Sequence, residues 1–157
     1  MVLKDGPGTM IGSILVLCTH NSVRSPILEA LIRDKFKQKL YVRAAGVEHT
    51  DINPFAVEVM KEIGFDLADY RTHSYKDLFQ DSYDLIIALS RPAFDLAKDI
   101  AKNQAVEIEY WSCPEPPTVG EGNREQILEG YRRIRDDLKL HLENRFQLAL
   151  NREDDRT

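Results

Sequence analysis

The sequence has little of several features that would assign it to a specialised class. Its 157 residues include only two cysteines, Cys18 and Cys113, which form neither a disulfide scaffold nor a CxxC pair. No apolar run approaches the roughly 20 residues of a membrane span, and the run at 14–17 is too short for a secretory signal. Lysine and arginine number 21 against 26 acidic residues, which gives a net charge of -5. Proteins that bind nucleic acid usually have an excess of basic residues, and this sequence has none. We therefore expect a cytoplasmic protein whose partners are neither nucleic acid nor membrane.

The sequence does contain enough apolar material for one folded domain. Hydrophobic residues make up 43% of the chain, and a chain of this length buries roughly 70% of its unfolded surface. Residues 1–12 hold several glycines and a proline and predict a flexible lead-in. Residues 151–157 are polar and predict a C-terminal tail, which leaves 13–150 as a single domain.

Strand and helix patterns alternate along this domain. Short apolar runs predict strands at residues 14–17, 40–45, 83–89 and 105–111. Apolar residues at helical spacing predict helices at 26–39, 53–64, 91–102 and about 124–148. Because such alternation is typical of a parallel sheet covered on both faces, we expect a three-layer α/β/α domain with four parallel strands.

The loop after the first predicted strand combines groups that bind anions. Cys18 ends the strand, and Arg24 and Ser25 open the helix that Pro26 starts. Ligands bind beyond the carboxyl ends of parallel strands, where a short strand-to-helix loop turns backbone N–H groups inward. The helix N-terminus favours anions, and the guanidinium of Arg24 can hold two phosphate oxygens. The loop 18–25 therefore predicts a site for a phosphate or sulfate ion.

Cys18 lies where this positive environment is expected to stabilise a thiolate. An ionised sulfur beneath a bound oxyanion is what covalent phosphoryl transfer to cysteine requires. Ser25 is placed to hydrogen-bond the thiolate, and Asn21 is the loop residue best suited to a left-handed conformation or to pinning the loop. From spacing alone an alternative stays open, in which Cys18 is a buried strand-end residue and Arg24 a surface residue.

Residues 17–30 (LCTHNSVRSPILEA) resemble the active-site loop of the low-molecular-weight protein tyrosine phosphatases and the related thioredoxin-coupled arsenate reductases. Weaker matches follow in the same order at 43–46, 53–66, 83–89 and 111–116. The resemblance implies a flavodoxin-like fold with strand order 2-1-3-4 and chemistry that needs no cofactor. The remaining histidines have no ligand spacing, which predicts no metal site.

The resemblance also implies a two-step hydrolysis of a phosphomonoester, with a phosphorylated protein or a small phosphoester as substrate. Cys18 would attack phosphorus, and Arg24 with the loop amides would bind the equatorial oxygens. Glu115 would protonate the leaving oxygen and then activate water to hydrolyse the cysteinyl-phosphate. The other loop positions would hold the substrate: Thr19, His20, Asn21, Ser22, Val23 and Ser25.

The chain departs from the family pattern at positions that bear on function. Glu115 replaces an aspartate as the acid, and one extra methylene changes where its proton lies. Pro117 and Thr118 stand where many members carry the aromatic residues of a phosphotyrosine slot. Ala44 and Tyr70 stand where a serine and a histidine usually support the loop asparagine, so Asn21 is expected to be held differently.

Two other functions stay open. Arsenate mimics phosphate, and the loop also fits the arsenate reductases, but Ser90 replaces the resolving cysteine that follows the third strand in that branch. Only Cys113 remains as a second thiol; it either approaches Cys18 or is an inert loop thiol, in which case arsenate reduction would use an external thiol. A non-catalytic oxyanion-binding protein, or pseudophosphatase, would keep Arg24 and the loop and use no acid.

Overall fold

The computed structural model describes residues 3–4, 10–78, 81–118, 120 and 122–154, and its centre is a parallel sheet. The strands are β3 (Ser13–Cys18), β4 (Tyr41–Gly46), β5 (Leu85–Ala88) and β6 (Glu107–Tyr110), in the spatial order β4-β3-β5-β6. All neighbouring pairs are parallel. This confirms the flavodoxin-like order 2-1-3-4, with the first strand of the sheet in its centre.

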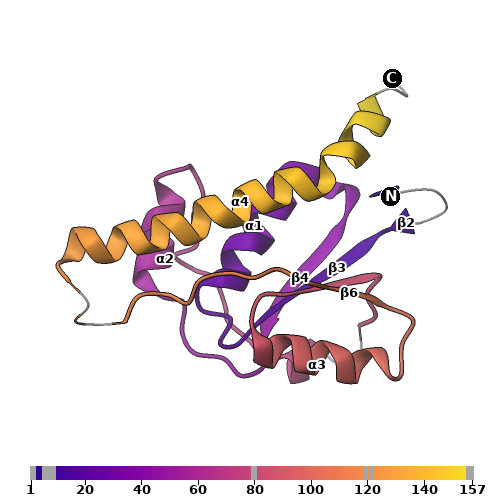
Figure 1. Ribbon diagram of the computed structural model, residues 1–157, viewed down its shortest axis with the longest axis horizontal. Helices are drawn as coiled ribbons and strands as arrows, with labels where there is room; N and C mark the ends of the chain where they lie inside the picture. Colours follow the sequence, from indigo (N-terminus) through magenta and orange to yellow (C-terminus); the bar gives the residue numbers. More distant parts are fainter. Residues whose placement is uncertain (1–2, 5–9, 79–80, 119, 121, 155–157) are drawn as a thin grey trace.

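Helices cover both faces of the sheet. The helices α1 (Arg24–Phe36), α2 (Pro54–Lys61) and α4 (Arg124–Asp154) form one layer, and α3 (Arg91–Ala101) forms the other. Figure 1 shows α3 on the side of the sheet opposite α1 and α4. Successive residues of β3 serve the two faces in turn, because strand side chains alternate: Ile14 and Val16 pack under α1, and Leu15 and Leu17 pack over α3.

Local sequence explains where these helices begin. Asn53 caps α2 by accepting the N–H of Phe55 at 2.8 Å, and Ser90 caps α3 by accepting the N–H of Ala93 at 3.2 Å. A proline occupies the first turn of each of these helices, where its missing N–H removes no hydrogen bond. Both caps follow the ends of strands, so helix starts and strand ends gather at one edge of the sheet.

The structure adds detail at both predicted ends of the domain. The lead-in 1–12 contains strands β1 (Leu3–Lys4) and β2 (Met10–Ile11), which pair with each other in an antiparallel two-stranded sheet; 1–2 and 5–9 lie outside the described residues. The last helix continues through Asp154 and so takes in part of the predicted tail, because 131–154 contain no glycine or proline to end it. Residues 155–157 lie outside the described part.

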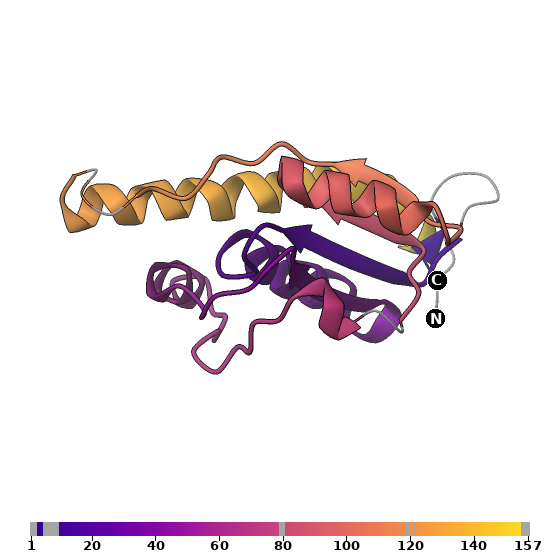
Figure 2. The ribbon, with the colours of Figure 1, turned by 90° about the horizontal axis from the view of Figure 1, so that it is seen from below.

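Smaller differences occur at other ends. The first helix stops at Phe36, and a 3₁₀ turn, η1 (Lys37–Lys39), leads to β4. A second such turn, η2 (Tyr75–Leu78), precedes β5. The segment 111–118 leaves β6 and runs back along α4 toward its first turn, as Figures 1 and 2 show. In the described residues, no helix is long and apolar enough to cross a membrane.

Candidate active site

The loop between β3 and α1 is turned so that its amides face inward. Its carbonyls at Cys18, Thr19, His20 and Ser22 accept hydrogen bonds of 3.0–3.2 Å from backbone N–H groups of residues 47–53. Because a trans peptide is planar, the N–H that follows each of these carbonyls points the opposite way. One such group, the N–H of Asn21, is 3.2 Å from the Cys18 sulfur. The loop therefore forms a concave array of donors around that sulfur, as an anion nest requires.

Gly46 lets the loop approach β4 this closely. A Cβ on Gly46 would lie 2.9 Å from the backbone nitrogen of Asn21 and from the carbonyl carbon of His20, and closer still to the Glu48 carbonyl oxygen. These neighbours are backbone atoms, which cannot swing aside. Asn21 has φ of 53°, the left-handed conformation expected for it. The loop thus depends on one glycine and one left-handed residue.

The side chain of Asn21 is fully buried, and its orientation is fixed by a backbone donor. Its Oδ1 accepts the N–H of His73 at 3.0 Å, so its Nδ2 must point the other way. That nitrogen donates to the Ser25 hydroxyl at 2.8 Å and to the Tyr70 hydroxyl at 3.3 Å. Asn21 is therefore held by Tyr70 and by a main-chain group, a different arrangement from the serine and histidine of the family pattern.

The direction of the hydrogen bond from Asn21 to Ser25 bears on the contact between the Ser25 hydroxyl and the Cys18 sulfur. The Ser25 oxygen is 2.9 Å from the Cys18 sulfur. Since that oxygen already accepts a hydrogen bond from Asn21, the serine proton is free to point at the sulfur. Cys18 is 2% exposed and accepts the Asn21 amide, and when its sulfur is ionised the Ser25 hydroxyl can only donate to it.

Arg24, the first residue of α1, is positioned from the neighbouring strand end. Its side chain is largely buried, and its Nη1 donates to the carbonyl of Leu89 at 3.4 Å. Ser90, the next residue, accepts a hydrogen bond from the Thr19 hydroxyl at 3.0 Å in addition to capping α3. Ser90 therefore has a structural role at the position where a resolving cysteine was considered.

A cleft of about 450 Å³ opens over this loop. Its lining includes Thr19, His20 and Arg24 from the loop and helix start, and Cys113 and Glu115 from the segment after β6. Glu115 is exposed and lines the same cleft as Arg24. The fold therefore gathers a guanidinium and a carboxylate from distant parts of the chain in one cleft beside the loop that holds the buried Cys18 sulfur.

The other predicted loop residues take up different places. His20 is exposed and forms an ion pair with Glu48, in which Nε2 and Oε1 are 2.9 Å apart. Val23 is buried and precedes the first turn of α1, and the Ser22 carbonyl accepts the N–H of Asn53. Neither Ser22 nor Val23 lines the cleft with its side chain, so any contribution from them comes through the backbone.

Residues 13–155 match the family model of the low molecular weight phosphotyrosine protein phosphatases. The chain belongs to this family.

Relatives in this family carry more than one activity. An arsenate reductase from Staphylococcus xylosus is 30% identical over 132 residues, which cover 84% of this chain and 94% of that protein. The YwlE arginine phosphatase from Geobacillus stearothermophilus is 25% identical, with a TM-score of 0.71 over 90% of this chain and 94% of that one. The tyrosine phosphatase amsI of Erwinia amylovora, 20% identical with a TM-score of 0.75 over 94% and 98%, shares the fold. Membership therefore establishes a phosphatase and arsenate reductase family and leaves the reaction to be argued.

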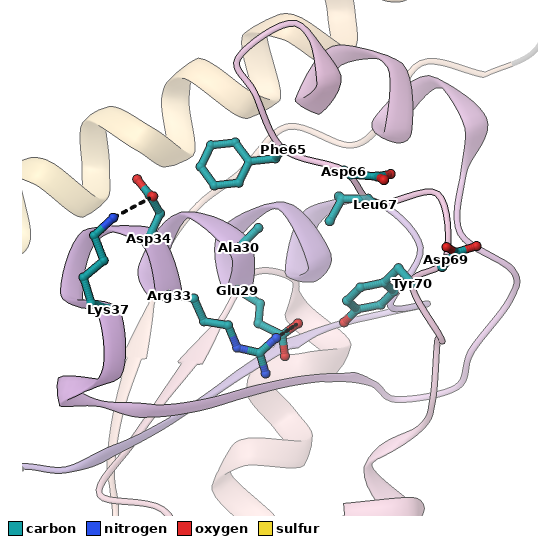
Figure 3. Close-up of a pocket in the computed structure, with 10 residues that line it drawn as sticks. All are labelled: Glu29, Ala30, Arg33, Asp34, Lys37, Phe65, Asp66, Leu67, Asp69 and Tyr70. Atoms are coloured by element: carbon teal, nitrogen blue, oxygen red, sulfur yellow. Dashed lines mark hydrogen bonds and ion pairs between the residues drawn. The ribbon is translucent and has the colours of Figure 1, made fainter.

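In this family member, the support of Asn21 extends to a second pocket. The Tyr70 hydroxyl accepts from Asn21, so its own proton is directed at Glu29 of α1, with which it forms a hydrogen bond. Figure 3 shows the two groups pointing toward one another in a pocket of about 630 Å³ between α1 and residues 65–70. The Glu29 side chain is only 5% exposed, and Arg33 lies 3.5 Å from it. Burial raises the pKa of Glu29, and Arg33 and Tyr70 offset part of that rise.

Sequence reasoning missed Glu29, noted Gly46 only within the family match at 43–46, and noticed Tyr70 only through the family pattern. Glu29 occupies an ordinary helical position, and its role depends on residue 70, which is 41 positions away in the chain. The signal for Gly46 was stronger, because a glycine directly after a predicted strand often marks a close backbone approach. The absence of a metal site stays a prediction. The described residues contain no group of three or more side chains suited to hold a metal ion.

Proposed function

We propose that this protein hydrolyses phosphomonoesters through a covalent intermediate on Cys18. The observation that carries the proposal is the environment of the Cys18 sulfur, which shares a hydrogen bond with the Ser25 hydroxyl and accepts the Asn21 amide inside an inward-turned loop. Arg24 and Glu115 line the cleft beside that loop. A buried cysteine with only a packing role would have no need of these donors.

In the first step the Cys18 thiolate attacks phosphorus. Arg24 and the amides of the loop bind the three equatorial oxygens, whose charge they offset as the bond to the leaving oxygen breaks. Glu115 supplies the proton to that oxygen, so that an alcohol or phenol leaves. The phosphoryl group is then bonded to sulfur, and the electron pair of the broken bond has gone to the leaving oxygen.

In the second step Glu115, now a carboxylate, takes a proton from water as the water attacks phosphorus. The sulfur–phosphorus bond breaks, and inorganic phosphate and the Cys18 thiolate are formed. Ser25 assists because its hydroxyl proton points at sulfur and stabilises the thiolate as it leaves. Each group used in the first step thus returns to its starting state.

The test is turnover of para-nitrophenyl phosphate between about pH 5 and 7.5 by four proteins: wild type, Cys18→Ser, Glu115→Gln and Glu107→Gln. We expect Cys18→Ser to lose turnover and still bind phosphate, and Glu115→Gln to lose about 10²- to 10⁴-fold in kcat. Glu107 is an exposed glutamate at the opposite end of β6 and serves as the matched control, with unchanged turnover. Absence of turnover by the wild type across this range would refute the proposal and favour a binding protein. Normal turnover by Glu115→Gln would refute the assignment of the acid.

Arsenate reduction is the second candidate, because curated relatives about 30% identical to this chain are named arsenate reductases. Cys18 would displace an oxygen of arsenate as water and form a sulfur–arsenic bond. A second thiol would then attack the Cys18 sulfur, which forms a disulfide as the bonding pair reduces arsenic and arsenite leaves. Burial raises the pKa of Cys113 to about 11, so this thiol is a poor nucleophile and an external thiol is the better reductant. Thiol-dependent arsenite formation that exceeds phosphoester turnover would favour this reaction.

A further inference from the structure

A glycine inside the last helix holds one end of the segment that carries Glu115. Gly130 lies within α4, where glycine lowers helix stability relative to alanine, and its φ is not in the left-handed region that would favour glycine. The ring of Pro117 accounts for it. A Cβ added to Gly130 would lie 3.3 Å from Cδ and 3.6 Å from Cβ of that ring, and closer than van der Waals contact to its Cγ. Pro117 therefore fills the space that a side chain at this position would take.

The contact with Pro117 is the second anchor of a short segment whose first anchor is in the sheet. Trp111 is buried, and its N–H donates to the carbonyl of Ala88 in β5 at 2.9 Å. Between the two anchors the segment runs along α4 (Figure 1), and Glu115 precedes Pro117 by two residues. A proline fixes its own φ and restricts the residue before it. Because Pro116 and Pro117 follow Glu115 directly, a displacement of the second anchor moves Glu115 as well.

The turn of α4 at Gly130 is itself tied to the loop between β3 and α1. Tyr131, the next residue, is 3% exposed, and its hydroxyl accepts the side-chain amide of Asn53 at 3.2 Å. The Asn53 N–H in turn donates to the Ser22 carbonyl of the loop at 3.0 Å. Since these contacts hold the helix, a Cβ added to Gly130 would displace the Pro117 ring and leave the loop in place.

We propose that Gly130 is a positioning residue, which sets the place of Glu115 in the cleft by admitting the Pro117 ring against the backbone of α4. This role rests on the proposed function, in which Glu115 is the general acid. A side chain on Gly130 would move Glu115 away from the leaving oxygen, while the Cys18 sulfur and the loop amides keep their places. Because a positioned acid supplies about 10²- to 10⁴-fold in rate, its displacement should slow phosphoryl transfer by about 10²-fold.

The choice of leaving group distinguishes a misplaced acid from a damaged loop. para-Nitrophenolate is a weakly basic anion that leaves with little help from an acid, whereas phenolate is more basic and leaves readily only as phenol. A misplaced acid therefore slows phenyl phosphate more than para-nitrophenyl phosphate. A damaged loop, whose donors bind the phosphate oxygens, slows both esters alike. The comparison uses kcat/KM, because this quantity includes phosphoryl transfer to Cys18 and excludes the later hydrolysis of the intermediate.

The experiment measures kcat/KM for both esters and the inhibition constant of inorganic phosphate with wild type, Gly130→Ala, Glu115→Gln and Glu129→Ala. We expect Gly130→Ala to lose about 10²-fold for phenyl phosphate and about tenfold or less for para-nitrophenyl phosphate, with unchanged inhibition by phosphate. Glu115→Gln should show the same preference and a larger loss. Glu129→Ala is the matched control, since it changes the exposed neighbour of Gly130 in the same helix, and should behave like the wild type.

A second variant approaches the contact from its other side. Pro117→Ala removes the ring that seats the segment, so it should also slow phenyl phosphate more than para-nitrophenyl phosphate. This variant decides the question if Gly130→Ala does not fold. Combined with Pro117→Ala, Gly130→Ala should have little further effect, because the added Cβ then meets no ring, whereas independent effects would multiply.

The outcomes separate the role of Gly130 from the proposed function. Equal losses for the two esters, weaker inhibition by phosphate that accounts for the loss, wild-type behaviour of Gly130→Ala, or multiplied effects in the double variant would overturn that role while Glu115→Gln still loses phenyl phosphate selectively. If Glu115→Gln shows no selective loss, the assignment of the acid is refuted together with its positioning. Turnover of neither ester by the wild type would overturn the hydrolase function, and with it any acid for Gly130 to position.

Discussion

Substituting alanine for Gly46 tests whether the shape of the loop, and not only its residue types, creates the site. The new Cβ would lie 2.9 Å from two backbone atoms of the loop, at His20 and Asn21, and closer to the carbonyl oxygen of Glu48. Real Cβ atoms do not approach so closely, so either the loop or residues 46–48 must shift. The same residues also hold the loop carbonyls, since Val47 and Glu48 donate to Cys18 and Thr19.

The expected magnitude follows from these contacts. Overpacking against atoms that cannot rotate away costs about 1–3 kcal/mol of stability. A displacement of the loop amides by about 1 Å costs on the order of 10²-fold in rate, because these amides meet charge that develops during reaction. We therefore expect Gly46→Ala to fold with reduced stability and to lose about 10²-fold in kcat/KM for an aryl phosphate.

The assay combines urea denaturation with turnover of para-nitrophenyl phosphate, and Gly64→Ala provides the control. Gly64 has φ of 91° and no atom within 4 Å of an added Cβ, so its substitution strains the backbone without touching the loop. We expect this variant to lose about 1 kcal/mol of stability and to keep wild-type turnover. If Gly46→Ala retains wild-type kcat/KM, or if both variants lose activity in proportion to stability, the reasoning about loop shape is wrong.

Three further predictions concern groups around the loop. Tyr70→Phe removes the hydroxyl that accepts from Asn21 and donates to Glu29. This variant should lower the free energy of unfolding by about 1–2 kcal/mol, measured by denaturation, and should reduce kcat, measured by turnover. Burial raises the pKa of Glu29, so the stability that its protonated form contributes should be present below about pH 4.5 and be lost as pH rises through the raised native pKa. Glu29→Gln should reduce this loss of stability when the free energy of unfolding is measured at about pH 5 and 7. The same loss in wild type and variant would contradict the prediction. Cys113, with its pKa raised to about 11 by burial, should resist iodoacetamide at about pH 8, and peptide mapping that shows rapid labelling would refute this.

The alternation of strands and helices could be predicted because it depends on patterns that are local in sequence, whereas the strand order followed from the family resemblance. Buried runs such as 14–17 and helical spacing around Ile27 and Leu28 report the layers directly. Strand lengths could not be predicted in the same way. The apolar run at 83–89 forms pairs only over Leu85–Ala88, with Ile14–Leu17 of β3 on one side and Glu107–Tyr110 of β6 on the other. Where a strand ends depends on its pairing with neighbouring strands, which a pattern within one segment does not contain.

The residues of the candidate site likewise differ in whether sequence alone could identify them. The loop residues were found because they are contiguous and each has a chemical reason to be there. The residues that orient the loop come from elsewhere and act through geometry that sequence does not encode: a main-chain N–H at His73, and the hydroxyl of Tyr70 with its partner Glu29.

The direction of the hydrogen bonds explains why residue 21 is an asparagine. The His73 amide fixes the carbonyl end of the Asn21 side chain, so its nitrogen donates to Ser25 and the serine proton is left for the Cys18 sulfur. An aspartate of the same shape would accept where asparagine donates. The serine proton would then be drawn toward the carboxylate, and the sulfur would lose its hydroxyl donor and gain a nearby negative charge. When the sulfur is ionised and can only accept, the hydrogen bonds from the His73 amide through Asn21 and Ser25 to Cys18 therefore have a single possible direction.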